Sequence, residues 1–137
     1  MAITFHPEPR MVLVCDFTTG FKEPEMVKVR PVIVLSPQRN NRETCIVVPL
    51  STVEPDPIQG FHHRLDPGSL PQRFRNEVSW VKGDMVTTVA LHRLDRVRSG
   101  KNKAGTRLYV AHKVMEIDWA ATQHAVAIAL GLGNRLI

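Results

Sequence analysis

Arg30 is the residue whose type and position best suit chemistry on an anionic substrate. It stands directly before the most apolar strand-like segment of the chain, residues 31–35, and follows a loop that contains Pro24. In such a place the side-chain stem can pack while the planar guanidinium is held for a bidentate contact with a phosphate. The competing interpretation, which position alone favours, is an ordinary strand-end arginine in a salt bridge or in solvent.

Hydroxyl and carboxylate groups stand near Arg30 in the predicted order of elements. Ser51 and Thr52 follow the apolar run 44–50, and their hydroxyls can donate to a phosphate oxygen or merely cap a turn. Glu25 precedes Arg30 in the same loop, where a carboxylate can act as a general base or simply face solvent. Each observation is weak when it stands alone.

A second group of polar residues lies farther along the chain. Lys82 and Asp84 flank Gly83 and present a cation and a carboxylate at one turn. His62 and His63 lie in a predicted short strand, so they point to opposite faces and only one can reach a given substrate. A histidine is the natural acid or base near neutral pH, although a histidine on a strand surface is commoner. No His, Cys, Asp or Glu cluster has metal-site spacing, so neither a metal nor another cofactor is expected.

The elements that must position these groups are mostly short strands. Apolar or alternating runs predict strands at 11–17, 31–35, 44–50, 60–65, 77–82, 85–91 and 107–114, with a hairpin loop at 101–105. One helix is predicted over 119–130, with Asp118 as its N-cap and Gly131 at its end. This order predicts a mainly β fold with a C-terminal helix, built on a strongly curved sheet or partly open barrel.

Composition sets the class of protein. The 137 residues, 43% of them hydrophobic, suit a single domain over 1–137. Lys and Arg number 18 against 13 Asp and Glu, and this net charge of +5 is common in proteins with polyanionic partners. The longest apolar run, 125–130, is too short to span a membrane, and no signal-peptide pattern occurs. With Cys15 and Cys45 expected as buried free thiols, the sequence predicts a cytoplasmic protein without membrane contact.

Taken in chain order, these segments resemble the PemK/MazF toxins, the ribonuclease halves of bacterial and phage-borne toxin–antitoxin pairs. The resemblance rests on the strand at 12–16, on Glu25, on Val-Arg-Pro-Val-Ile-Val-Leu-Ser-Pro at 29–37 and on Val-Val-Pro-Leu-Ser-Thr at 47–52. Val-Lys-Gly-Asp at 81–84 is similar to a later basic-x-Asp segment of the family, and Leu-His-Arg-Leu at 91–94 is similar to the Arg-Leu that follows it. The Arg-Pro strand and the Pro-x-Ser/Thr strand end are specific as a pair.

The resemblance implies an SH3-like, strongly curved sheet that works as a homodimer without a metal or cofactor. It implies sequence-specific cleavage of single-stranded RNA, usually mRNA, in which a 2′-hydroxyl attacks the adjacent phosphorus. The products are a 2′,3′-cyclic phosphate and a 5′-hydroxyl. The implied protein partner is a cognate antitoxin, and operator DNA is expected to bind only the toxin–antitoxin complex.

The family's functional positions can be transferred residue by residue. Arg30 falls on the catalytic arginine, Ser51 on the catalytic threonine, and Glu25 on an acidic loop residue. Asp84 falls on the family's later Asp, and Lys82 on an Arg beside it. The expected catalytic residues are therefore Arg30, Ser51 and Glu25, and the expected substrate-binding residues are Lys82 and Asp84, to which Thr52 and His62 are added from their own type and position. Two departures concern the substrate-binding group: Met85 and Thr87 stand where the family often has Gln and Arg, and Lys82 cannot bind bidentately as Arg does.

Two other functions fit parts of the sequence. A toxin similar to the gyrase poison CcdB would share the fold but act by binding a protein, although that group lacks the Arg-Pro and Pro-x-Ser pairing. A basic nucleic-acid-binding module without chemistry would fit the net charge. An aromatic content of 6%, with few aromatic residues among the basic ones, gives little support to a base-stacking surface.

Overall fold

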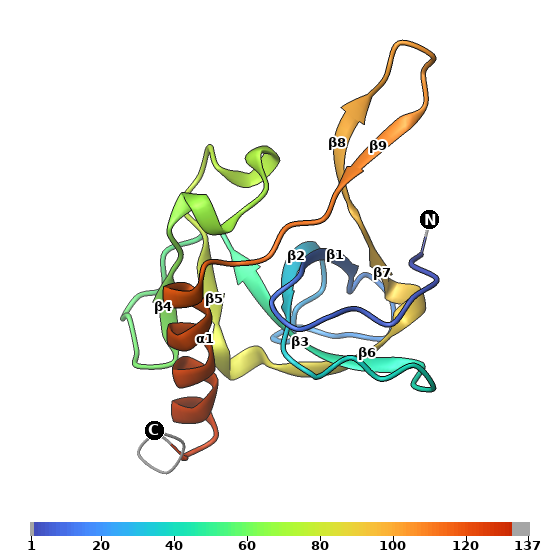
Figure 1. Cartoon of the computed structure of the whole chain (residues 1–137). Helices are drawn as coiled ribbons and strands as arrows, with labels where there is room; N and C mark the ends of the chain where they lie inside the picture. Colours follow the sequence, from blue (N-terminus) through green and yellow to red (C-terminus); the bar gives the residue numbers. More distant parts are fainter. Residues whose placement is uncertain (1, 133–137) are drawn as a thin grey trace.

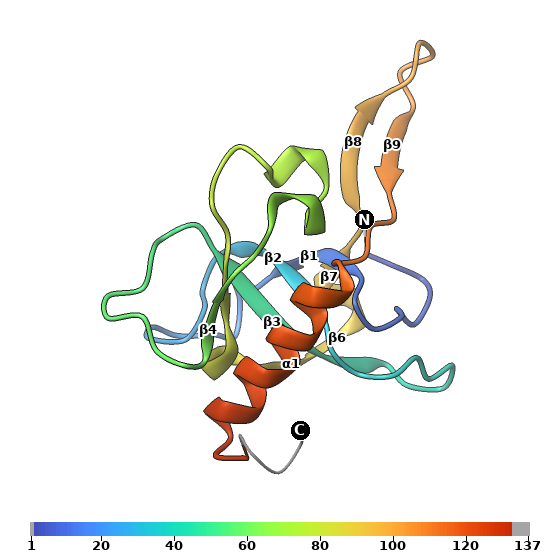
Figure 2. The same ribbon diagram turned by 60° about the vertical axis from the view of Figure 1, so that its left-hand side comes forward.

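The computed structural model describes residues 2–132 and shows a mainly β protein with one C-terminal α-helix (Figures 1 and 2). The strands are β1 (Val12–Asp16), β2 (Val29–Val34), β3 (Thr44–Ser51), β4 (His62–Arg64), β5 (Trp80–Lys82), β6 (Thr87–Ala90), β7 (Leu94–Asp95), β8 (Val97–Lys101) and β9 (Arg107–Val110). The helix α1 spans Glu116–Ala129, and short 3-10 turns occur at η1 (Pro67–Ser69), η2 (Gln72–Phe74), η3 (Gly83–Met85) and η4 (Leu91–Arg93). None of these helices is long and apolar enough to cross a membrane.

Seven strands form one antiparallel sheet in the order β4-β5-β3-β2-β1-β7, with β6 also paired to β3. The path ends at β4 on one side and β7 on the other, so the sheet does not close. The long strand β3 changes partners along its length: Val47 is the last residue paired with β6, and Leu50 is the first paired with β5. Pro49, which has no N–H to donate, falls in the gap between these two partners.

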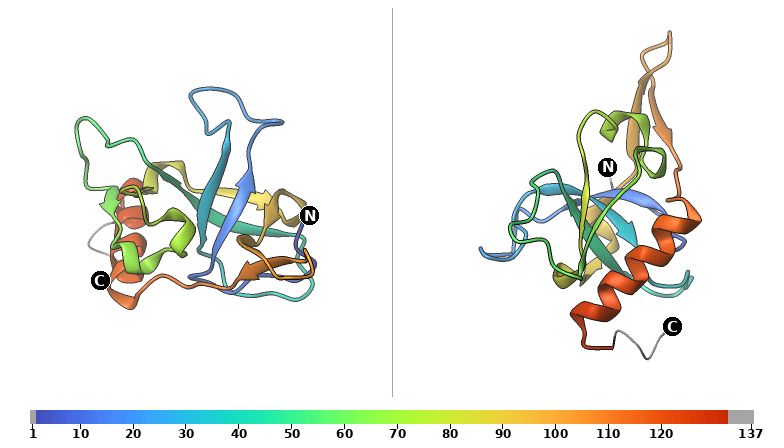
Figure 3. Two further views of the ribbon diagram at one scale, coloured as in Figure 1. Left: turned by 90° about the horizontal axis from the view of Figure 1, so that it is seen from above. Right: turned by 90° about the vertical axis from the view of Figure 1, so that its left-hand side faces the viewer.

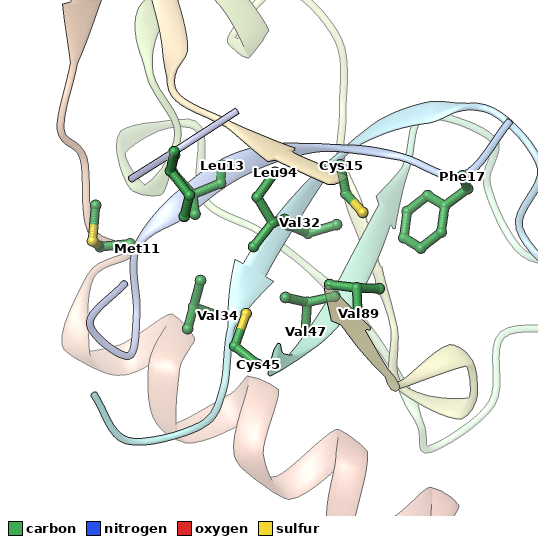
Figure 4. Close-up of a cluster of buried hydrophobic side chains, with 11 residues drawn as sticks. Met11, Leu13, Cys15, Phe17, Val32, Val34, Cys45, Val47, Val89 and Leu94 are labelled. Atoms are coloured by element: carbon green, nitrogen blue, oxygen red, sulfur yellow. The ribbon is translucent and has the colours of Figure 1, made fainter. Parts of the chain in front are cut away.

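The strands bury side chains on both faces of the sheet, which explains their continuous apolar sequences. On β2, Val32 and Val34 face one core cluster (Figure 4), whereas Ile33 faces the other. The first cluster also contains Leu13, Cys15, Phe17, Cys45, Val47, Val89 and Leu94, and the second contains Val12, Val48, Leu50, Leu65, Leu70, Val81, Val97 and Val114. Burying each large aliphatic side chain stabilises the fold by roughly 1.5–3 kcal/mol. The two buried cysteines are free thiols, as the sequence predicted.

The helix packs behind η3 and β4, and two of its features differ from the prediction. It begins at Glu116, and its N-cap is Met115, which makes no side-chain capping bond. Asp118 is instead buried within the first turn, so the predicted N-cap at Asp118 is wrong. Its carboxylate accepts hydrogen bonds from His63 Nε2 at 2.8 Å, from the Asp66 backbone N–H at 3.0 Å and from the Ser69 hydroxyl. The Asp118 carboxylate binds residues that are distant in sequence instead of capping its own helix, and for this reason the local capping pattern predicted the wrong role.

Two segments extend from the body of the molecule. The β8–β9 hairpin stands out from the sheet (Figures 1 and 2) and forms a separate two-stranded ribbon. Its presence confirms the hairpin predicted around residues 101–105. Viewed from above, the β1–β2 connection stands out from the ends of those two strands, well apart from α1 (Figure 3, left). This second segment carries Glu25 and leads into Arg30.

Candidate active site at the ends of β2 and β3

Arg30 occupies the second position of β2, directly opposite Cys15 of β1. Because side chains alternate along a strand, it shares the face of Val32 and Val34, which belong to the first core cluster. The residue is half-buried, and its Nε is fully buried without a hydrogen-bond partner among residues 2–132. A buried donor left unpaired costs roughly 1–3 kcal/mol. The Arg30 side chain therefore holds an unsatisfied donor at the edge of the core.

Ser51 ends β3 on the same face of the sheet. The last pair of the β2–β3 register is Val32 with Pro49, and Arg30 and Ser51 each lie two residues beyond that pair, at neighbouring strand ends. The Ser51 Oγ accepts a hydrogen bond from the Val53 backbone N–H at 3.1 Å, so its own hydrogen can be donated elsewhere. The predicted arginine and hydroxyl thus lie at the same end of two adjacent antiparallel strands, beyond the last paired residues of those strands.

A cross-strand row begins at Ser51 and runs through β5 to β4. Trp80 of β5 lies opposite Ser51, and Arg64 of β4 lies opposite Trp80. Trp80 is buried, whereas Arg64 is exposed. Sequence reasoning missed both residues, since only the pairing of strands far apart in sequence places an aromatic ring and a second guanidinium in line with Ser51. No local signal marks either position.

Glu25 stands between Arg30 and the second predicted group. It lines a pocket of about 310 Å³ together with Arg30 and Met85. It also lines a neighbouring pocket of about 650 Å³ with Lys82 and Asp84. The turn that carries it is closed by a 2.8 Å bond from the Lys22 N–H to the Glu25 carboxylate and by a backbone bond of 2.8 Å in the reverse direction. The loop carboxylate, the cation and the later carboxylate therefore meet at one hollow.

Two aromatic rings line the larger pocket. Phe17 and Phe21 meet edge to face, with ring centroids 5.1 Å apart. The guanidinium of Arg93 lies over the Phe21 ring at 4.8 Å, and its Nη1 donates to the Asp16 carbonyl at 3.0 Å. Arg93 belongs to the Leu-His-Arg-Leu segment. Through its contacts with Phe21 and Asp16, Arg93 supports the β1–β2 connection.

His62 and His63 point to opposite faces, as the alternation of a strand predicted. His62 is paired with Lys82 across β4 and β5, while His63 contacts Asp118 of α1 behind the sheet. Burial and the nearby Lys82 cation lower the pKa of His62, and Asp84 opposes this shift. Its Nδ1 accepts the Gln59 N–H at 2.9 Å, so the neutral ring carries its hydrogen on Nε2. Of the two histidines, His62 is on the side of the candidate site.

Thr52 is not brought to the same hollow. It lines a separate pocket of about 290 Å³ with Pro31 and Arg73, around the strand end from Arg30. Its substrate-binding role stays a prediction. Among residues 2–132, no three His, Cys, Asp or Glu side chains gather in a way that could hold a metal ion.

Comparison with known proteins identifies the family. Residues 8–117 match the PemK-like, MazF-like toxins of type II toxin–antitoxin systems. The Escherichia coli (strain K12) protein YifN is 36% identical over 118 residues, covering 72% of this chain and 78% of YifN.

Solved structures share the fold at lower identity. MazF from Deinococcus radiodurans superposes with a TM-score of 0.64 at 16% identity, covering 93% of this chain and 98% of that one. An endoribonuclease from a mycobacterial species gives 0.62 at 18% identity, covering 95% and 97%. A mycobacterial endoribonuclease in complex with its cognate antitoxin gives 0.59 at 20% identity, covering 92% and 96%. The match over residues 8–117 shows that this chain belongs to the PemK-like, MazF-like toxin family of type II toxin–antitoxin systems.

Proposed function

We propose that this protein is a toxin endoribonuclease that cleaves single-stranded RNA, with mRNA as its usual substrate. The observation that carries the proposal is the buried, unpartnered Nε of Arg30, at the place where the family motif puts its catalytic arginine. A phosphate bound at the half-buried guanidinium would supply the missing acceptor once the side chain turns its Nε toward solvent. The reaction is transesterification, in which an RNA 2′-hydroxyl attacks the adjacent phosphorus and the 5′-oxygen leaves.

Charge stabilisation falls to the Arg30–Ser51 pair. As the phosphorus becomes five-coordinate, negative charge grows on its non-bridging oxygens, and donors already aimed at them stabilise that state. Arg30 supplies a fixed cation with several N–H donors, and Ser51 supplies a neutral O–H from the neighbouring strand. Neither contribution needs a metal, and we propose that the reaction is metal-independent.

Proton transfer requires a base for the 2′-hydroxyl and an acid for the leaving oxygen. Glu25 is the proposed base, since it lines the same small pocket as Arg30. Lys82 and Asp84 are proposed to bind the adjoining nucleotide in the larger pocket, with His62 beside them. We assign Arg30 the contact that stabilises the negative charge on the leaving 5′-oxygen, and a solvent water supplies the proton that this oxygen takes up.

Several properties of the assembly belong to the same proposal. We propose that the open, curved sheet corresponds to the SH3-like partly open barrel of the family. We propose a cytoplasmic homodimer that a cognate antitoxin inhibits, with operator DNA bound only by their complex. The antitoxin complexes of related structures support a partner of this kind.

The decisive experiment incubates the protein with a long single-stranded RNA in EDTA. Wild type is expected to leave 2′,3′-cyclic phosphate ends, and both Arg30→Ala and Ser51→Ala are expected to lose cleavage. Ser51→Thr keeps a hydroxyl and should remain active, unlike Ser51→Ala. Arg39 is an exposed arginine outside the proposed site, so Arg39→Ala should leave the activity unchanged. Cleavage that required a divalent metal, or that survived Arg30→Ala undiminished, would overturn the proposed mechanism. RNA that stayed intact while the protein bound gyrase would favour the CcdB-like alternative.

A further inference from the structure

The segment from Arg96 to Met115 carries the positive charge of this protein. No Asp or Glu occurs in it, and it contains six cations: Arg96, Arg98, Lys101, Lys103, Arg107 and Lys113. The whole chain has 18 Lys and Arg against 13 Asp and Glu, so the remainder has 12 cations against 13 carboxylates, a net charge of −1. The basic character of the chain therefore resides in the projecting β8–β9 hairpin and its flanks.

The two faces of the hairpin carry different side chains, one mostly cationic and the other mostly apolar. Arg98 lies opposite Tyr109, and Lys101 lies opposite Arg107. These four residues share one face of the ribbon. The irregularity between Arg98 and Gly100 adds one residue to β8, so Lys101 lies on the same face as Arg98 although the two are three positions apart. We call them the cationic ribbon face. The opposite face carries Val97, Val110, Leu108 and Gly100, of which Val97 and Val110 pack into the second core cluster.

The cationic ribbon face also offers a ring for stacking. The guanidinium of Arg96 lies 3.9 Å from the centroid of the Tyr109 ring. Tyr109 is half-buried, whereas Arg98, Lys101 and Arg107 are exposed. Unpaired nucleic-acid bases stack on aromatic rings and on guanidinium planes, while exposed cations beside them contact the phosphates. Both kinds of group occur here within one short ribbon.

A basic track connects this ribbon with the candidate active site. Thr52, next to Ser51, shares a pocket with Arg73, in which Glu77 is the one carboxylate among the lining residues. Arg73 in turn shares a pocket of about 550 Å³ with Arg98 at the base of the ribbon, and that pocket is lined without any carboxylate. The surface thus runs from the end of β3, past Arg73, to Arg98 at the base of the ribbon, which is the first residue of the cationic ribbon face.

We propose that the cationic ribbon face binds the single strand of RNA that flanks the cleaved bond. The inference rests on the proposed ribonuclease function and extends the substrate contact well beyond Arg30. An acidic protein segment is a poorer fit, because it would need apolar pockets among the cations, and the apolar side chains of the ribbon lie on its other face. The ribbon therefore acts in binding and leaves the chemical step to the Arg30 site.

The test measures binding of a fluorescent, fully 2′-O-methylated RNA of about 20 nucleotides, which lacks the attacking hydroxyl. We compare wild type with Lys101→Ala/Arg107→Ala and with the control Arg39→Ala/Arg42→Ala, which removes two exposed cations elsewhere. Each phosphate contact to a single strand contributes about 0.7 to the slope of log affinity against log salt. The ribbon variant should lower that slope by about 1.4 and bind about 25-fold more weakly at 0.1 M salt, with the difference vanishing near 1 M. The control should stay near wild type.

Three results would overturn the inference: an unchanged slope in the ribbon variant, equal weakening in both double variants, or tighter binding of a DNA duplex than of the single strand. Cleavage separates this inference from the proposed function. A short RNA of about six nucleotides around a mapped cut site should be cleaved equally by wild type and ribbon variant, whereas the long RNA should show a raised KM in the variant. If wild type cleaves no RNA yet binding still depends on the ribbon, the ribonuclease proposal fails and the binding assignment stands. If cleavage occurs and the ribbon variant matches wild type on both RNAs, the inference fails alone.

Discussion

Asp118, in the first turn of α1, accepts a 2.8 Å hydrogen bond from Nε2 of His63, a residue 55 positions earlier on β4. Its second carboxylate oxygen accepts from the Asp66 backbone N–H and the Ser69 hydroxyl. Through these contacts one buried side chain joins the helix to the β4–η1 segment. His62, the neighbour of His63, is thereby held on the opposite face, toward the candidate site.

Asp118→Ala should therefore destabilise the whole fold. The change leaves a histidine, a hydroxyl and a backbone N–H without their acceptor, and the expected loss in the free energy of unfolding is about 3 kcal/mol. Asp66→Ala is the control, because Asp66 is exposed and, within residues 2–132, its side chain accepts only from the Gly68 N–H. That variant should lose about 1 kcal/mol or less. Urea unfolding of both variants checks the prediction, and equal losses would contradict it.

Gly83 sets how closely α1 approaches the Lys82-Gly83-Asp84 turn. A Cβ there would lie 2.6 Å from the Phe61 carbonyl oxygen and 3.0 Å from the Ala125 backbone. Gly83→Ala should cost roughly 1–3 kcal/mol and displace Lys82 and Asp84. At Gly60 the nearest atoms are the flexible tip of Ile128 at 3.4 Å, so Gly60→Ala should be nearly neutral. Thermal unfolding of the pair measures the difference, and a fully stable Gly83→Ala protein would contradict the packing described here.

The titration of His62 should report its neighbours. Burial and Lys82 lower its pKa below the usual 6.5, and Asp84 opposes them. Lys82→Met should therefore raise the pKa of His62, and Asp84→Asn should lower it further. NMR titration of the ring carbons measures both shifts. Since the unfolded chain binds this proton more tightly, His62 should reduce stability as the pH falls through about 6.5 and have no effect well above it. If neither substitution changed the pKa of His62, its ring would not lie beside Lys82 and Asp84.

The two cysteines should not react with thiol reagents in the folded protein. Burial raises the pKa of Cys15 to about 12 and that of Cys45 to about 11, so both remain thiols at pH 8. The thiolate is the reactive form, and the buried side chains are also shielded from reagent. Ellman's reagent should find no thiol in the native protein and two after denaturation in guanidinium chloride. Rapid native labelling would show that the first core cluster opens.

Arg30→Lys separates charge from geometry in the proposed reaction. Lysine keeps the positive charge but lacks the planar fork and the Nε donor, so it cannot make the bidentate contact. We expect kcat to fall by about 100-fold or more, with a smaller change in KM, because the lost bond matters most in the transition state. Single-turnover cleavage measures the effect. A fully active Arg30→Lys enzyme would mean that Arg30 supplies only charge.

Much of this architecture follows from local sequence. Continuous apolar runs at 31–35 and 44–50 favour buried strands, and the polar, Gly-containing segment 101–105 indicates a hairpin loop, which the pairing of β8 with β9 confirms. The Arg-Pro and Pro-x-Ser positions identified the family, and with it the expectation that Arg30 and Ser51 work together. Strand alternation alone predicted that His62 and His63 separate, and the structure confirms it.

Relationships between distant segments were decided only by the tertiary structure. Asp118 has the look of an N-cap in sequence, yet burial against Ser69 and Asp66 gives its carboxylate partners 49 and 52 residues away. Trp80 and Arg64 join the row of Ser51 because β5 and β4 happen to pair beside β3, which no local pattern records. The net charge of +5 was visible in the composition, but the gathering of Arg98, Lys101 and Arg107 on one face of a projecting ribbon depends on the strand register. Local propensity determines which residues form strands, whereas the packing of those strands determines which side chains meet.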